Sequence, residues 1–340
     1  MTISENNSNT IHMDNLKKVT RRGLFYNSSP GVCSIWESGR MCYEALKTCN
    51  DFEIDYTDTD KYLKPGYDFY VINWHDVVCN WISDEDLENC KVPKFAIVTE
   101  VCYEPGRSII SRSKPGFTYY IVLDPTISDE GNIISFTRPI KDTTRIPIRE
   151  TCKEEMECPI IGMFGFATYG KEWHKVVEAV QNEYDHAIIR INIPEATFLP
   201  NNSERFDVIY NECNAVLKKD GIRLYISHVL LSPDELITWC AYNTLNVFFY
   251  NRTFVYNVKE GLCATVDQAV ASRRPLLVSE DPTFRHVHAY LKPYPETSLR
   301  EAILGDNQKV VCQIARDWHP SNFADKFKTL LKRVKIQKIL

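Results

Sequence analysis

The sequence lacks an excess of charge of either sign. Its 340 residues include 40 lysines and arginines against 45 aspartates and glutamates, which gives a formal net charge of −5. Such a chain has no global field that would recruit nucleic acid or an acidic membrane, so a polyanion would need a local site. The one basic run, in residues 326–338, alternates with apolar residues in an amphipathic helical pattern. It indicates either a docked terminal helix or a patch for nucleic acid or a membrane.

The sequence also lacks paired cysteine motifs and long apolar runs. Its 12 cysteines are spread from Cys33 to Cys312 without a CxxC pair, which argues against a disulfide framework or a zinc site in a chain of this size. No apolar run approaches the ~20 residues of a membrane span, and residues 1–20 are polar, without the apolar core of a signal peptide. We therefore expect a reduced, cytoplasmic protein that begins with a disordered tail at 1–20 and has no transmembrane segment.

What the sequence does contain is an alternation of short apolar runs with amphipathic helical stretches. The hydrophobic fraction of 44% and the charged fraction of 25% are those of a globular protein and exclude disorder, collagen and coiled coil. Alternation of this kind is typical of stacked βαβ units and a mostly parallel sheet, the α/β class. The strands are expected at 23–26, 69–73, 95–98, 119–123, 159–164, 186–191, 222–227, 245–249 and 275–278.

A polar stretch with two prolines divides the chain in the middle. Residues 142–159 carry eight charged side chains between two regions of alternating pattern, which is typical of a linker. Since roughly 100–200 residues make one domain, the length also favours two. We expect an N-terminal domain at 21–150 and a C-terminal domain at 151–317.

Two loops in the second half could bind phosphate. In residues 162–180 an apolar strand is followed by a loop with three glycines and then by a helix, with Lys171 at the start of the helix. In residues 259–284 a glycine-containing loop again precedes a helix, and Glu260 comes just before that loop's glycine. Glycine lets backbone amides approach a ligand, and a helix N-terminus favours an anion. Each stretch taken alone is equally explained by an ordinary turn or crossover, with Glu260 as a cap or a solvated side chain.

Together these two stretches resemble the C-terminal half of a GT-B glycosyltransferase of the group-one or family-four type. The family pattern G-R-L-x-x-x-K-G is similar to 165–171, and E-G-x-x-x-x-x-x-E-A-x-A-x-G-x-P-V-V is similar to 260–277. Between them, 231–250 resembles the segment in which a short helix precedes a strand. The resemblance covers roughly 160–287. It implies two Rossmann-like domains with parallel sheets facing across a cleft, and a C-terminal helix at 318–340, starting near Trp318, that packs back on the N-terminal domain.

The resemblance also implies a donor site for a nucleotide-diphosphate sugar. Lys171 and the amides of Gly261, Leu262 and Cys263 would face the diphosphate, together with the N-terminal loop at Gly31; Glu260 would face the sugar, Gln268 the ribose and the backbone near Val229 the base. A lysine and a helix N-terminus can neutralise a departing diphosphate, so we expect no metal and no cofactor beyond the nucleotide sugar as co-substrate.

Catalytic residues are expected in the N-terminal domain, near the reacting sugar. The family usually has a histidine after one of the later strands, where this sequence has Glu100. His75, next to Asp76 at the end of the preceding strand, is a substitute candidate because a carboxylate can orient and charge its ring. Its alternative is a structural role.

Three positions depart from the family pattern. The expected arginine is Phe166, the second glutamate is Gln268, and the glycine before the proline is Arg273. Losing the arginine removes one cation from the leaving group unless Arg252 or Arg274 replaces it.

Two short motifs could hold a metal, each with a plainer alternative. Asp58 and Asp60 form a D-x-D in a polar loop, which is also typical of a solvated turn. His286 and His288 would face the same way on a strand, but no third ligand accompanies them.

The resemblance thus implies a glycosyltransferase that moves a sugar from a nucleotide-diphosphate sugar, with retention and without metal. The acceptor is open among a glycan, a lipid-linked sugar, a protein, a small molecule and a modified DNA base. One alternative, favoured by Phe166 and Gln268, is a non-catalytic GT-B scaffold that binds a nucleotide or a partner. A lesser alternative is a sugar-nucleotide epimerase, for which the sequence shows no added acidic cluster.

Overall fold

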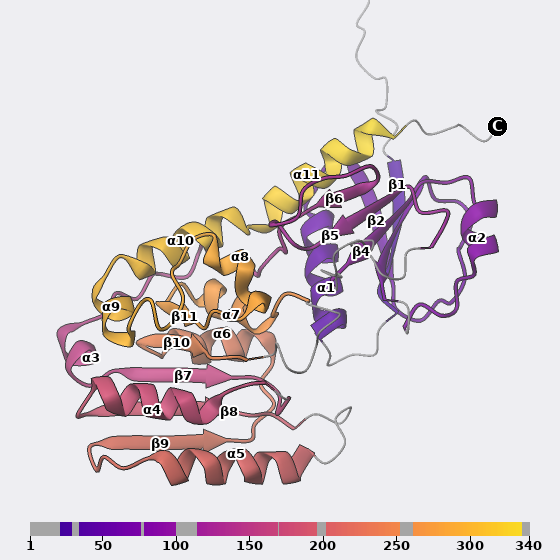
Figure 1. The fold of residues 1–340 in the computed structure, drawn as a ribbon. Coiled ribbons are helices and arrows are strands. Elements are labelled where there is room, and N and C mark those ends of the chain that lie inside the picture. Colours follow the sequence, from indigo (N-terminus) through magenta and orange to yellow (C-terminus); the bar gives the residue numbers. More distant parts are fainter. Residues whose placement is uncertain are drawn as a thin grey trace, which may run out of the picture.

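The computed structural model describes residues 21–28, 34–75, 78–99, 114–168, 170–195, 202–251 and 261–334. Its strands form two parallel sheets, of six and five strands, with helices packed around each (Figure 1). The predicted α/β class with two parallel sheets is confirmed. No helix in the described part of the chain is long and apolar enough to cross a bilayer.

The N-terminal sheet has the strand order β2-β1-β3-β4-β5-β6. Its central strand β3 is buried at all six positions, as expected for a parallel strand covered on both faces. Helices α1 and α2 lie on its two sides, α2 being a short helix that Ser83 caps. The bounds are β1 Arg21–Tyr26, α1 Ser34–Lys47, β2 Phe52–Thr57, β3 Phe69–Trp74, α2 Asp84–Asn89, β4 Lys94–Val98, β5 Tyr119–Val122 and β6 Ile133–Ser135.

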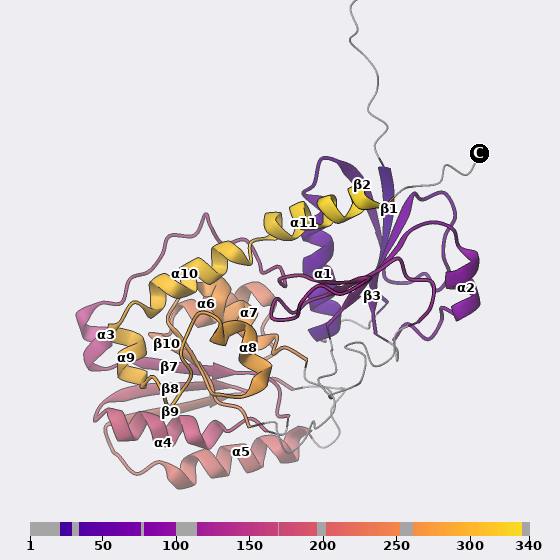
Figure 2. The same ribbon diagram turned by 45° about the horizontal axis from the view of Figure 1, so that its top comes forward.

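The C-terminal sheet has the order β11-β10-β7-β8-β9. Helices α4 and α5 cover one of its faces and α6 and α7 the other (Figure 2). The bounds are β7 Ile160–Phe164, α4 Trp173–Glu183, β8 Ala187–Asn192, α5 Asn202–Val216, β9 Ile222–Ser227, α6 Pro233–Ala241, β10 Leu245–Phe248, α7 Thr265–Ser272, β11 Leu276–Val278, α8 Arg285–His288, α9 Leu299–Leu304 and α10 Asn307–Asp317. The chain leaves β7 toward β8 on one side and later returns to β10 on the other. Ligands of such sheets bind at this switch in strand order, outside the carboxyl ends of the strands.

The last helix, α11 Pro320–Arg333, returns to the N-terminal sheet, as the yellow helix in Figure 1 shows. His319 caps it and Pro320 is its first residue. The ring of Phe327 lies 5.0 Å from that of Phe95 and 5.6 Å from that of Phe52, within the core that α1 shares. The basic run of this helix therefore belongs, over its described part, to a helix docked by its apolar face.

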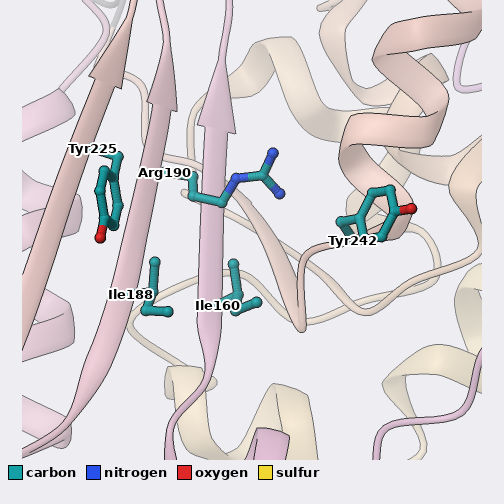
Figure 3. Close-up of a pocket in the computed structure, with 5 residues that line it drawn as sticks. All are labelled: Ile160, Ile188, Arg190, Tyr225 and Tyr242. Atoms are coloured by element: carbon teal, nitrogen blue, oxygen red, sulfur yellow. The ribbon is translucent and has the colours of Figure 1, made fainter.

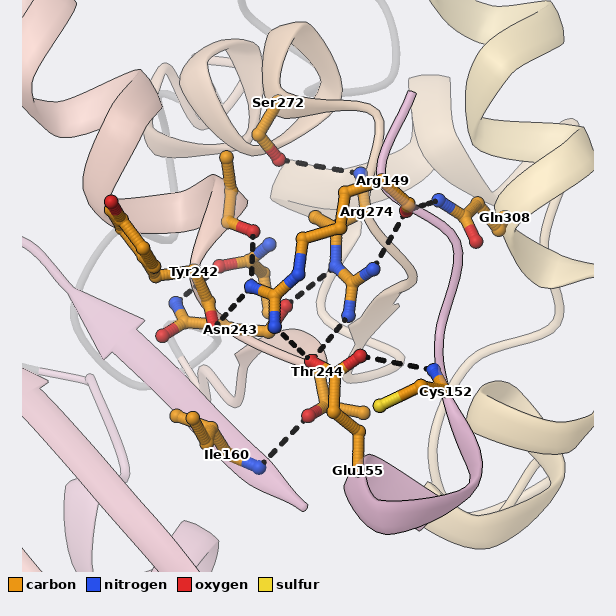
Figure 4. A network of polar contacts seen from close by, with 12 residues as sticks. Arg149, Cys152, Glu155, Ile160, Tyr242, Asn243, Thr244, Ser272, Arg274 and Gln308 are labelled. Atoms are coloured by element: carbon orange, nitrogen blue, oxygen red, sulfur yellow. Dashed lines mark hydrogen bonds and ion pairs between the residues drawn. The ribbon is translucent and has the colours of Figure 1, made fainter. Parts of the chain in front are cut away.

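The segment expected to be a linker is fastened to the C-terminal sheet near the amino ends of its strands. It contains one short helix, α3 Lys153–Glu157. Figure 4 shows the contacts: Arg274, 1% exposed, donates to the carbonyl oxygens of Asn243 and Arg149 and pairs with Glu155 at 3.2 Å, while Gln308 also donates to the Arg149 carbonyl. The buried Arg274 side chain therefore ties the linker to the loops at the amino ends of the C-terminal strands.

One sequence expectation about local structure is wrong. His286 and His288 lie in helix α8 and not on a strand, so they do not face the same way. Residues Pro282–Phe284 form a 3-10 turn just before α8.

Candidate functional site

The candidate site lies at the carboxyl ends of β7 and β10, where the strand order switches. The loop that follows β7 runs back beside the end of β10: the amide of Glu172 donates to the carbonyl of Phe249 at 2.8 Å, and the amide of Asn251 donates to Gly170 at 2.7 Å. Lys171 and Tyr250 form the bridge between these two hydrogen bonds. The predicted glycine-containing loop is therefore held by the neighbouring strand.

Gly165 allows the side chain of Lys171 to lie against the backbone. Its φ is +139°, and a Cβ there would stand 2.5 Å from Lys171 Nζ. Lys171 Nζ donates to the Phe166 carbonyl at 2.8 Å and lies 5.5 Å from the centre of the Tyr250 ring. The ammonium is thus placed at the strand switch by a position that only glycine tolerates.

The amino end of α7 adjoins this lysine. Thr265, the first residue of α7, shares a hydrogen bond of 3.1 Å with the Tyr250 hydroxyl and one of 2.8 Å with Cys263 Sγ. Its methyl carbon lies 3.3 Å from the Cβ position at Gly165. No described side chain caps α7 at Ala264, and the amide of Asp267 donates to the Ala264 carbonyl at 3.2 Å, so the amides of Thr265 and Val266 are the ones that remain for an anion. The two loops singled out from the sequence therefore meet.

The three loop residues expected at a diphosphate differ in how their backbone is used. Cys263 donates its amide proton to the Thr283 carbonyl at 3.0 Å, so this amide is directed away from an anion. Leu262 is buried and its carbonyl accepts from Arg138 at 3.4 Å. Gly261 begins the described stretch and is half-buried.

The expected base and ribose positions lie beside this centre. The buried side chain of Asn192 binds both backbone groups of Val229. The Val229 amide donates to Asn192 Oδ1 at 3.3 Å, and Asn192 Nδ2 donates to the Val229 carbonyl at 3.1 Å. A base would therefore need other groups near the end of β9. Gln268 lies in the first half of α7, half-buried, and its side chain bonds to none of the described residues.

In the N-terminal domain, His75 directly follows β3 at the carboxyl end of the sheet. Its carbonyl accepts from the amides of Val78 and Cys79, which turns the chain there. Gly31, Glu100 and Glu260 lie outside the described residues.

Arg138 connects the N-terminal half with the first turn of α7. It follows β6, is 4% exposed and pairs with Asp267 at 3.1 Å. Burial raises the pKa of Asp267 to about 6, against the opposing attraction of Arg138. This pair was not expected from the sequence.

The residues that depart from the family pattern lie at different places in the C-terminal domain. Phe166 contributes its carbonyl to Lys171, whereas Arg274 lies at the amino ends of the strands with Glu155 and cannot replace the missing arginine. Arg273 takes the left-handed conformation, at φ 55°, that a glycine would occupy, and donates to the carbonyls of Thr143 and Ile146 in the linker. Sequence reasoning missed Arg205, in the first turn of α5, which donates to the Ala167 carbonyl at 3.5 Å within the same loop.

Neither short metal motif forms a cluster. Asp60 accepts from the Thr57 hydroxyl and pairs with Lys64 at 2.6 Å, which is the contact pattern of a turn. His286 is buried against Trp318, and His288 lies 2.9 Å from the Ser279 carbonyl. Within the described ranges no group of three or more His, Cys, Asp or Glu side chains could hold a metal.

The fold is that of the GT-B glycosyltransferases, and solved structures of this class match most of the chain, which confirms the resemblance at the level of fold. Anabaena HepE in complex with UDP and glucose matches over 92% of this chain and 100% of its own, with 9% identity and a TM-score of 0.55. The E. coli trehalose-6-phosphate protein bound with UDP-2-fluoro glucose matches over 93% of this chain and 100% of its own, with 9% identity and a TM-score of 0.61. The lipopolysaccharide outer core galactosyltransferase WaaB matches over 92% of this chain and 99% of its own, with 10% identity and a TM-score of 0.59. No protein-family model and no curated protein sequence matches the chain.

Proposed function

We propose that the protein is a glycosyltransferase that takes its sugar from a nucleotide-diphosphate sugar. The observation that carries the proposal is the meeting of Lys171 with the amino end of α7, which no described side chain caps, at the strand switch. That place in the fold is where a ligand of such a sheet binds, and both groups favour an anion. HepE and the E. coli protein, which share the fold, bind UDP or a UDP-sugar, so a UDP-sugar is the first donor to test.

The chemistry assigned to these groups is stabilisation of the leaving diphosphate. As the bond to the sugar breaks, negative charge grows on the diphosphate oxygens, and fixed donors aimed at that charge lower the barrier. Lys171 would supply the full charge and α7 the partial charge of its amides, which allows transfer without a metal. Glu260 would contact the sugar hydroxyls and Gln268 the ribose.

The acceptor side is assigned to the N-terminal domain. His75 stands at the carboxyl end of β3, which pairs with β4, and Glu100 comes shortly after β4 in the sequence. We propose that His75 or Glu100 acts near the reacting sugar and that transfer proceeds with retention, as the family resemblance implies.

The proposal predicts a specific nucleotide-dependent stabilisation. Ligand at 100 times its dissociation constant adds about 2.7 kcal/mol to the free energy of unfolding. Thermal unfolding with UDP, GDP and ADP, with and without Mg²⁺, should show one metal-independent shift. Lys171→Met keeps the apolar stem beside Tyr250 and removes the charge, so it should abolish that shift.

Lys175→Met is the matched control. Lys175 lies on α4, exposed and paired with Glu178 at 3.1 Å, and its loss should leave the nucleotide shift intact. Assays of UDP-sugar hydrolysis and transfer then test catalysis. A full shift in Lys171→Met, or a shift that requires Mg²⁺, would contradict the proposed site.

A non-catalytic scaffold remains the second candidate because of two specific observations. Phe166 stands where the family arginine is expected, and Arg274 is committed to Glu155 at the far end of the strands. Nucleotide binding with neither hydrolysis nor transfer would favour this second function.

A further inference from the structure

A pocket lies on the face of the C-terminal sheet, apart from the strand ends that form the candidate donor site. It has a volume of about 390 Å³, within the range of about 300–1,000 Å³ typical of small-ligand sites. Its lining residues are Ile160, Ile188, Arg190, Tyr225 and Tyr242 (Figure 3). Ile160 is the first residue of β7, so the pocket extends toward the amino ends of the strands.

Arg190 is the one charged residue in this lining. It is half-buried on β8, and its guanidinium carbon lies 4.6 Å from the ring centre of Trp239. One nitrogen, Nη1, donates to Asn243 Oδ1 at 2.9 Å and to the Trp239 carbonyl at 3.5 Å. The Nε and Nη2 groups donate to none of the described residues, and no described carboxylate pairs with this arginine.

The arginine is held in place by its surroundings. Register pairs Arg190 with Gly162 on β7, and a Cβ at Gly162 would stand 1.9 Å from Asn243 Nδ2. The absence of a side chain at Gly162 therefore lets Asn243 pack across β7, where it accepts from Arg190 and donates to Asn246 at 2.8 Å. Burial lowers the pKa of Arg190, which is the cost of a cation that has no counter-charge.

The remaining lining is aromatic and aliphatic. Tyr225 on β9 is 56% exposed and Tyr242, at the end of α6, is 61% exposed. In Figure 3 the Arg190 side chain extends from its strand toward Tyr242, while the two isoleucines lie together toward the other end. A sugar would need several polar partners for its hydroxyls, which this lining does not offer, whereas a flat apolar ring fits it.

We propose that this pocket binds a small aromatic carboxylate. Its ring packs against the tyrosines and isoleucines, and its carboxylate accepts from the Nε and Nη2 groups of Arg190, whose fork geometry matches two carboxylate oxygens. The site is distinct from the donor site and does not depend on the proposed transferase activity.

The test is a calorimetric titration of the full chain with naphthoate and with its neutral counterpart naphthamide. Naphthoate should bind at least about tenfold more tightly, because a charge-assisted bidentate contact is lost in the amide. Arg190→Gln should abolish that preference. Tyr225→Ala should weaken naphthoate binding without loss of core packing, since the Tyr225 ring is exposed.

Arg300→Gln is the matched control. Arg300 also stacks on an aromatic ring, at 4.8 Å from the centre of Tyr184, but lies outside the pocket, so its loss should leave naphthoate binding unchanged. Lys171→Met should bind naphthoate normally, and Arg190→Gln should keep the nucleotide shift, which separates the two sites. Equal binding of acid and amide, an unchanged preference in Arg190→Gln, or no binding at millimolar probe would overturn the proposal.

Discussion

At the scale of single residues, His286 is an imidazole buried without a hydrogen bond to any described residue. It is 2% exposed, and neither ring nitrogen has a hydrogen-bond partner in the part of the chain that the structure describes. Its ring stacks on Trp318 at 5.2 Å, and the charges around it are those of Asp124, Arg138, Arg285 and His288. Burial, aided by the nearby arginines, lowers the pKa of His286 well below its usual value.

This residue predicts a loss of stability in mild acid. Because the folded pKa lies below the unfolded value near 6.5, the unfolded chain takes up a proton first as the pH falls. The contribution of His286 to the free energy of unfolding is full above that value and declines as the pH falls below it. His286→Phe keeps the stacked ring and should lose less stability over this range, measured by urea unfolding. The exposed control His186→Gln should behave as the unmodified chain, and parallel profiles for His286→Phe would refute the explanation.

The candidate site was partly predictable residue by residue. Lys171 and the start of α7 could be brought together because the carboxyl ends of parallel strands meet at one edge. The Arg138–Asp267 pair could not, since its members are 129 positions apart and each alone is an ordinary surface type. The same holds for Cys263, whose amide is taken by a carbonyl that no motif indicates.

At the scale of elements, α11 shows how a terminal helix completes a distant core. Phe327 is fully buried among Phe52, Phe69 and Phe95, each on a different strand. Phe327→Ala should cost about 3–5 kcal/mol of unfolding free energy, because it leaves a cavity among rings that cannot all collapse. Leu304→Ala on α9 is the control, since that side chain is 57% exposed. A similar small effect of both substitutions on urea unfolding would mean that α11 contributes little to this core.

Long apolar strands were predictable, whereas the short or polar elements were not. β2 is an edge strand in which Glu53 and Asp55 alternate with apolar residues, so it forms no continuous apolar run. β6 has three residues, and α2 buries only Leu87, which leaves no periodicity to detect. These elements are held by their neighbours and by local capping, which pattern reading does not measure.

At the scale of the whole molecule, contacts beside α7, and others along α11 and the linker, join the two halves. Arg138 pairs with Asp267, and Arg285 donates twice to Asp124. The amide of Ile140 donates to the Trp318 carbonyl, which joins the two segments that run between the sheets. Asp124 follows β5, and Arg285 begins α8. The carboxyl end of the N-terminal sheet is therefore tied to the second half beside α7, the helix proposed to bind the donor.

The Asp124–Arg285 pair should be strongly coupled. Its carboxylate is 2% exposed and its shortest distance is 2.6 Å, so removing either partner leaves a buried charge alone and should cost about 3–5 kcal/mol. In a double-mutant cycle of Asp124→Asn and Arg285→Gln, the double variant should lose far less unfolding free energy than the sum of the losses in the two single variants. The exposed pair Lys175–Glu178 should show a coupling of at most about 1 kcal/mol. Additive losses of unfolding free energy at Asp124 and Arg285 would mean that the two residues are not coupled and that other contacts hold the halves together. Nucleotide affinity in the same variants would report whether donor binding depends on this pair.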